Sequence, residues 1–154
     1  MTKLLSYMLR LRRPIRHPAR PRVPVVAAGT DEEDRSVLRQ VAQREHWSVE
    51  FANSSEEAWV IANRKTAPVI LCDRDLPETD WRAAVRSLAA LPHHPVVILL
   101  SKVADEYLWN EVFRIGGFDI LARPLRTEEI RRAVGLALSY WRSEAATKIS
   151  GAGP

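Results

Sequence analysis

The sequence has one cysteine, no long apolar run and no acidic residue near its N-terminus. With Cys72 alone, no disulfide can form within the chain, and its place in an apolar run predicts a buried thiol. No apolar stretch reaches the roughly 18–20 residues needed to cross a bilayer. Basic residues follow the apolar N-terminal stretch and no small-residue cleavage site comes after it, which argues against a secretory signal. We therefore expect a cytoplasmic protein.

Positive charge is concentrated at the N-terminus. Residues 1–22 hold seven Lys and Arg and no acid, and the whole chain has a net charge of +4, so the remainder carries −3. This distribution argues against nucleic-acid binding by the folded body. Prolines from Pro14 to Pro24 interrupt any helix, so we expect residues 1–22 to be a flexible basic arm. The arm could touch an anionic membrane, a nucleic acid or an acidic partner, or it could be a leader without a role.

Between residues 23 and 142, short apolar runs alternate with helical patterns. Helix-start residues and apolar residues at helical spacing, such as Leu38, Val41 and Ala42, follow each run. We expect the last helix to end near Trp141 and residues 143–154 to form a flexible tail. The expected strands are Val23–Ala28, Ser48–Ala52, Pro68–Cys72, Pro95–Leu100 and Phe118–Leu121.

Continuously apolar strands indicate a sheet that is covered on both faces, which is typical of parallel sheets. Five strand–helix units with right-handed crossovers predict an α/β fold, (βα)₅. The expected architecture is a flavodoxin-like, doubly wound, five-stranded parallel sheet in the order 2-1-3-4-5. Such sheets place their sites at the carboxyl ends of the strands.

Polar side chains follow four of these strands. Asp73 comes directly after the third strand and Ser101 after the fourth, while Arg123 follows the fifth. An acidic loop, residues 31–34, follows the first. Parallel strands end at one edge of a sheet, so we expect a carboxylate, a hydroxyl and a cation to meet there. A solvated or helix-capping Asp73 in a domain without signalling function is the alternative.

Over about residues 23–141 the sequence resembles the receiver domain of bacterial response regulators. Asp73 lies four residues before Pro77, as in that family's phosphorylation loop. The other similar positions are Ser101 for the family's Thr or Ser, residues 123–125 for its Lys-Pro-Phe, and residues 116–121 for its Gly-Ala-x-x-Tyr-Leu. The resemblance implies that Asp73 accepts a phosphoryl group from a histidine kinase, that Ser101 hydrogen-bonds that group, and that Arg123 pairs with its charge.

The resemblance also implies Mg²⁺, bound by the phosphoacceptor, an acidic pair after the first strand and the backbone carbonyl of residue 75. Gly29 and Thr30 hold the positions of that pair, and neither supplies a carboxylate. The remaining candidate ligands are Asp73, Asp75 and Asp31. Because Mg²⁺ demands near-octahedral oxygen geometry, we expect these three to bind it weakly or not at all.

Three further positions depart from the family pattern. Arg123 replaces a lysine, and its planar fork could pair with Asp73 through two hydrogen bonds and hold the pocket in one state. Ile120 stands where an aromatic switch residue is usual. Trp81 stands where the family usually has a glycine. It is either a contact residue or packed on Leu76.

We therefore expect a stand-alone receiver-like signalling domain, not an enzyme, with weak or no Mg²⁺-dependent phosphorylation of Asp73. It would act by docking to a histidine kinase or another signalling protein, or by dimerising through the face of the fourth helix, fifth strand and fifth helix. Tyr107, Trp109, Phe113 and Tyr140 are on the helices of that face. Two alternatives remain open: a fully competent phosphoreceiver and a flavin- or nucleotide-binding domain. The acidic residues after Gly29 would repel the phosphate of a flavin or nucleotide.

Overall fold

The computed structural model describes residues 20–77 and 79–151 of the chain. Within this part, five parallel strands form one sheet in the order β2-β1-β3-β4-β5, so the predicted topology is confirmed. The strands are β1 (Val23–Ala28), β2 (Trp47–Ala52), β3 (Val69–Asp73), β4 (Val96–Ser101) and β5 (Asp119–Ala122).

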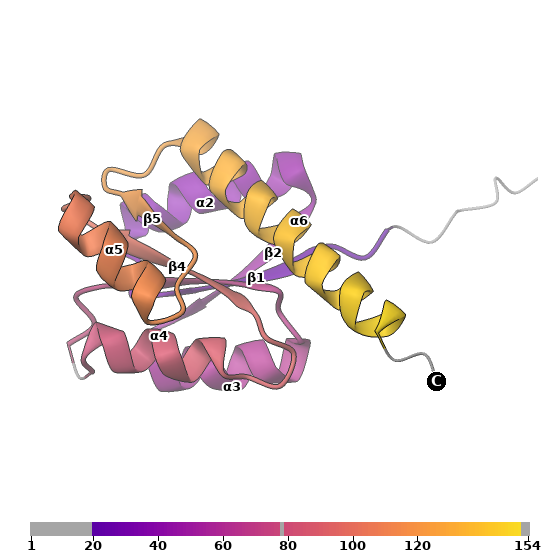
Figure 1. Cartoon of the computed structure of the whole chain (residues 1–154). Coiled ribbons are helices and arrows are strands. Elements are labelled where there is room, and N and C mark those ends of the chain that lie inside the picture. Colours follow the sequence, from indigo (N-terminus) through magenta and orange to yellow (C-terminus); the bar gives the residue numbers. More distant parts are fainter. Residues whose placement is uncertain (1–19, 78, 152–154) are drawn as a thin grey trace, which may run out of the picture.

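Helices cover both faces of this sheet (Figure 1). One face carries α2 (Glu32–Glu45) and α6 (Thr127–Ser150), and the other carries α3 (Ser55–Lys65), α4 (Trp81–Ala89) and α5 (Glu106–Arg114). Two apolar clusters fill the layers between sheet and helices. Every residue of β4 is buried, which explains why the strand is apolar without alternation up to its last residue, Ser101.

Aspartate or serine side chains begin four of the helices. Asp31, Ser54, Asp80 and Asp105 each accept a hydrogen bond from a backbone N–H of the first turn that follows. Such caps satisfy donors that the helix itself leaves free. Each of these four caps comes after a strand of the sheet, β1 to β4 in turn, so together they fix where the chain turns away from the carboxyl edge.

The helix α6 continues beyond its expected end. The prediction of a flexible tail from residue 143 is wrong for residues 143–150, which extend the helix to Ser150. Alanines and charged residues in this stretch favour helix, and no glycine or proline interrupts it before Gly151. The predicted basic arm lies outside the described residues up to position 19.

Two tryptophans hold the helices to the body. Trp81 is buried with Leu76 in the cluster beneath α4, so of the two readings of this residue the packed one is confirmed. Trp141 on α6 donates its indole N–H to the carbonyl of His93 at 2.9 Å. Among the described residues, no helix has the length and apolar character that a membrane span needs.

Candidate functional site

The carboxyl ends of β3, β4 and β5 bring three predicted site residues to one edge of the sheet. Asp73 is the last residue of β3, Ser101 is the last residue of β4, and Arg123 directly follows β5. Backbone hydrogen bonds of 2.9 Å, from Arg74 to Leu100 and from Arg123 to Ser101, continue the ladder at this edge. The parallel sheet therefore fixes the spacing of these residues.

The side chain of Arg123 grips the carboxylate of Asp73. Its Nη1 donates to Oδ1 and its Nη2 donates to Oδ2 of Asp73, both at 3.2 Å. This is the two-pronged arrangement that a planar guanidinium forms with a carboxylate. The geometry that the sequence suggested for this pair is present.

Asp34 on α2 is a third member of the site that the sequence analysis did not select. Its Oδ2 accepts a hydrogen bond from Nε of Arg123 at 3.1 Å and lies 3.0 Å from Nη2 of the same guanidinium, as an ion pair. The side chains of Arg123, Asp34 and Asp73 are only 13%, 5% and 14% exposed. We call these three residues the Arg123 clamp, because they join α2, β3 and the loop after β5.

The position of Asp34 follows from local sequence. Asp31 caps α2 by accepting from the backbone N–H of Asp34 at 2.8 Å, and Asp34 accepts in return from the N–H of Asp31 at 3.3 Å. This reciprocal pair is a capping box, and it holds the Asp34 carboxylate at the helix start. Since α2 begins just after β1, that carboxylate reaches the edge where Arg123 lies. From the sequence, Asp34 was assigned only to the acidic loop of residues 31–34 that follows the first strand.

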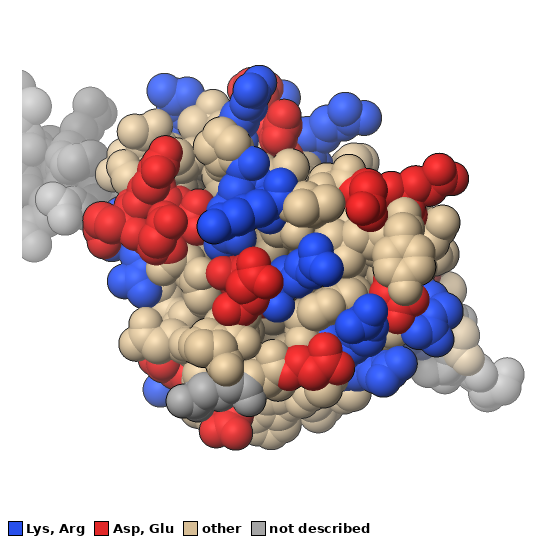
Figure 2. All heavy atoms as spheres, turned by 90° about the vertical axis from the view of Figure 1, so that its left-hand side faces the viewer, with Lys and Arg blue, Asp and Glu red and all other residues tan. Residues whose placement is uncertain are grey.

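The electrostatics of the clamp favour a permanently charged guanidinium. Burial by itself would lower the pKa of Arg123, but the hydrogen bond to Asp34 and the charge of Asp73 outweigh it, so the pKa lies above its ordinary value. At neutral pH two carboxylates and one guanidinium leave an excess of one negative charge. Figure 2 views the molecule from the side where the strands end, and acidic and basic groups are interspersed on that face.

The loop after β1 has no room for an acidic side chain beside Asp73. Gly29 has a φ of +79°, and a Cβ added to it would lie 2.6 Å from the Cβ of Asp73 and 2.8 Å from Leu76. The hydroxyl of Thr30 accepts from Arg35 at 3.4 Å. Glycine is required here both by the positive φ and by the close approach of Asp73.

Ser101 is buried, and its hydroxyl is engaged by the backbone. Its Oγ accepts from the N–H of Val103 at 3.1 Å. Ser101 thus lies at the expected strand end, with its oxygen holding the start of the following loop. Nearby, burial and the charge of Asp73 raise the pKa of the Cys72 thiol to about 12, so the predicted buried thiol is confirmed.

The two other predicted metal ligands are not gathered with Asp73. Asp31 is exposed and serves as the cap of α2, and the exposed Asp75 reaches Asp73 through its backbone N–H, at 2.9 Å from Oδ1. In the part of the chain that the structure describes, no three His, Cys, Asp or Glu side chains are grouped to hold a metal. The carboxylates that do meet, Asp34 and Asp73, already share a cation. These residues do not fit a Mg²⁺ site.

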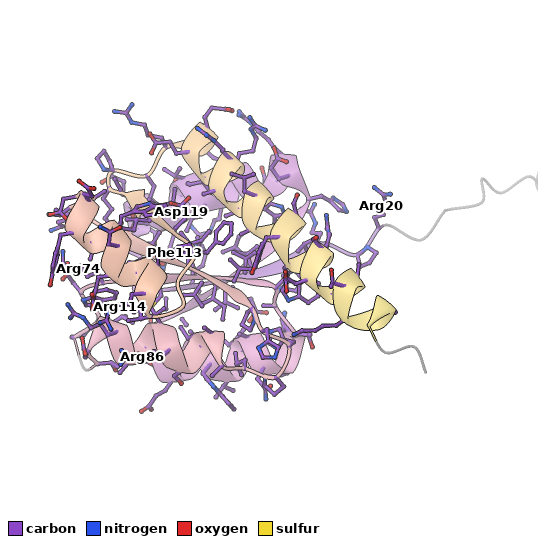
Figure 3. All side chains as sticks on the ribbon, viewed as in Figure 1. Arg20, Arg74, Arg86, Phe113, Arg114 and Asp119 are labelled. Atoms are coloured by element: carbon purple, nitrogen blue, oxygen red, sulfur yellow. The ribbon has the colours of Figure 1, made fainter. Side chains whose placement is uncertain are left out.

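The four aromatic residues that we expected on the docking face, on α5 and α6, are all exposed. Tyr107, Trp109 and Phe113 on α5 and Tyr140 on α6 lie at the surface, with Trp109 46% and Phe113 64% exposed. The rings of Trp109 and Phe113 stack with centroids 5.9 Å apart. Figure 3 labels Phe113 on α5, and a cavity of about 380 Å³ is lined by Phe113 and Tyr140.

Comparison with known proteins agrees with this architecture. The family model described as "Response regulator receiver domain" matches residues 25–135. The chain belongs to the response-regulator receiver family. The receiver fold recurs in the chemotaxis response regulator CheY4 of Vibrio cholerae, with a TM-score of 0.67 and 18% identity over 75% of this chain and 98% of that one. It also recurs in a signal receiver domain from Pseudomonas fluorescens Pf-5, with a TM-score of 0.72 and 19% identity over 82% and 94%.

Curated relatives are longer proteins. The 3',5'-cyclic-nucleotide phosphodiesterase regA of Dictyostelium discoideum is 27% identical over 130 residues, which are 79% of this chain and 16% of that protein. The transcriptional regulatory protein SrrA of Staphylococcus aureus is 28% identical over 102 residues, 65% of this chain and 42% of that protein. The chain thus spans less than half the length of these relatives.

Proposed function

We propose that this receiver domain signals by docking to a histidine kinase or another signalling protein, and that Asp73 is phosphorylated weakly or not at all. The observation that carries the proposal is the Arg123 clamp. An incoming phosphoryl group would need the cation that Asp73 and Asp34 already share. The excess negative charge of the clamp opposes a further anion.

The pattern of groups around Asp73 supports weak phosphorylation on a second ground. In phosphoryl transfer the equatorial oxygens carry negative charge in the transition state, and a cation beside them is needed to stabilise it. The only clamp cation is bound to the attacking carboxylate itself, which makes both of its oxygens hydrogen-bond acceptors. Gly29 and Thr30 supply no carboxylate for a metal. Asp73 is thereby held as a structural partner of Arg123.

Intact-mass spectrometry after incubation with acetyl phosphate and Mg²⁺ tests this half of the proposal. We expect little or no mass increase by one phosphoryl group. Asp73→Asn defines the background, and Asp75→Asn, which alters an exposed neighbour, is the matched control. A stoichiometric adduct in the wild type and in Asp75→Asn that is absent from Asp73→Asn would overturn the proposal.

The docking half depends on exposed aromatic surface. Trp109 and Phe113 are stacked at the surface of α5, a kind of side chain that often carries binding energy. In binding assays against each purified histidine kinase of the source organism, Trp109→Ser should weaken the interacting pair at least about tenfold. Asp73→Asn should change that affinity little. An interaction that requires acetyl phosphate and is lost in Asp73→Asn would contradict phosphate-independent docking.

A further inference from the structure

Arg123 lies between two carboxylates that come from different elements. Its three nitrogens lie 3.0–3.2 Å from Oδ2 of Asp34 and both carboxylate oxygens of Asp73. The side chains involved are at most 14% exposed. The carboxylates of Asp34 on α2 and Asp73 on β3 would repel each other without a counter-ion. The positive charge of Arg123 between them offsets that repulsion.

We propose that Arg123 is the resident cation of this site and replaces a divalent metal ion between Asp34 and Asp73. This proposal rests on the proposed function. It gives the physical reason for it, since a resident cation keeps the clamp in one state. It goes further in stating that the chain has no metal requirement. It also states that the guanidinium occupies the place between Asp34 and Asp73 that a metal ion would need.

The surroundings of the clamp support this role. A divalent ion bound to Asp73 would lie beside the Arg123 guanidinium, which cannot lose its charge. Two positive charges that share one carboxylate repel each other strongly in a partly buried site. Gly29 leaves no space for another carboxylate next to Asp73. The carboxylate of Asp31 is committed to the cap of α2.

Removal of the guanidinium charge should turn the clamp into a cation site. In Arg123→Gln, the carboxylates of Asp34 and Asp73 would face each other without a counter-ion. A cavity of about 300 Å³ borders Asp34 and Arg123, so an ion can approach Asp34 at the place that the guanidinium would vacate. Carboxylate oxygens are the ligands that hard divalent ions prefer. We therefore expect Arg123→Gln to bind a divalent ion that the wild type leaves in solution.

Electron paramagnetic resonance of free Mn²⁺ measures this directly. Wild-type protein titrated with Mn²⁺ should leave the free-ion signal unchanged, whereas Arg123→Gln should take up one ion per chain with an affinity at least about tenfold higher. The double variant Arg123→Gln/Asp34→Asn should lose that uptake. Arg126→Gln, which removes an exposed arginine three residues away, should behave as the wild type. Circular dichroism verifies that each variant is folded.

The wild type keeps the proposal falsifiable if Arg123→Gln does not fold. Its unfolding midpoint should be independent of millimolar Mn²⁺, since an ion that bound only the native state would raise it. A midpoint that rises with Mn²⁺ in the wild type and not in Asp34→Asn overturns the resident-cation role. A folded Arg123→Gln that takes up no Mn²⁺ overturns it as well.

These outcomes are separate from those of the phosphorylation assay. Wild-type protein that binds Mn²⁺ yet takes no phosphoryl group would remove the resident cation and leave the proposed function standing. Protein that binds no Mn²⁺ yet becomes phosphorylated would overturn the proposed function and leave the resident cation standing.

Discussion

The guanidinium of Arg123 and the carboxylate of Asp73 face each other through two hydrogen bonds of equal length, 3.2 Å. They come from residues 50 positions apart, at the ends of β3 and β5. With Asp34 they tie together α2, β3 and the loop after β5. An ion-pair network therefore occupies the carboxyl edge of the sheet in this chain.

Asp34→Ala should be among the most destabilising single changes at this edge of the sheet, because Asp34 is buried. It leaves Arg123 with one partner in a partly buried site and removes half of a capping box, and such losses cost about 2–4 kcal/mol. Chemical denaturation gives the free energy of unfolding. Asp31→Ala is the matched control, because it removes the same box from its exposed side and should cost about 1 kcal/mol. Equal losses in the two variants would mean that the contact with Arg123 contributes nothing.

Gly29→Ala should destabilise the protein by about 2–4 kcal/mol, because it combines a positive φ with overpacking. The new methyl group would lie 2.6 Å from the Cβ of Asp73, where neither backbone can easily retreat. Gly135→Ala on α6 provides the opposite control. A Cβ there meets no atom within 4 Å, and replacing a helical glycine should stabilise the protein by about 0.5–1 kcal/mol. Denaturant midpoints for both variants decide the matter.

Glu111 should make stability depend on pH in the acid range. Hydrogen bonds from Arg114 and Arg82 lower its pKa from 4.5 to about 2; Figure 3 labels Arg114 on α5. A carboxylate with a depressed pKa contributes stability above its unfolded-state pKa and loses that contribution as pH falls through its folded-state pKa. The difference in unfolding free energy between wild type and Glu111→Gln should therefore be constant above about pH 5 and vanish toward about pH 2. A difference that stays constant down to the lower limit would contradict this assignment.

The fold could be predicted from the sequence because each strand is marked by local signals. β4, for example, is apolar from Val96 to Leu100, and the spacing of Leu38, Val41 and Ala42 marks the buried face of α2. Ends were less predictable, since α6 has no breaker near Trp141 and runs to Ser150. An end of this kind depends on weak propensities rather than on one residue.

The candidate site was predicted only in part. The pairing of Asp73 with Arg123 could be inferred, because both follow parallel strands whose ends share one edge. Asp34 was missed because its partner is 89 residues away and its local role as a capping residue already accounted for it. The other two candidate metal ligands, Asp31 and Asp75, are both exposed, and Asp31 caps α2, a local role that the strand pattern does not encode.

Cys72 should be unreactive in the native protein. Burial under α4 and the adjacent charge of Asp73 raise the pKa of its thiol to about 12, so the reactive thiolate is scarce at neutral pH and reagents cannot reach it. Iodoacetamide at pH 8 should modify the chain only after denaturant is added, with one adduct per chain by mass spectrometry. Leu76→Ala, which removes a side chain from the same apolar cluster, should speed labelling by opening the layer. Rapid modification of the folded wild type would mean that the edge around Asp73 opens more readily than the clamp allows.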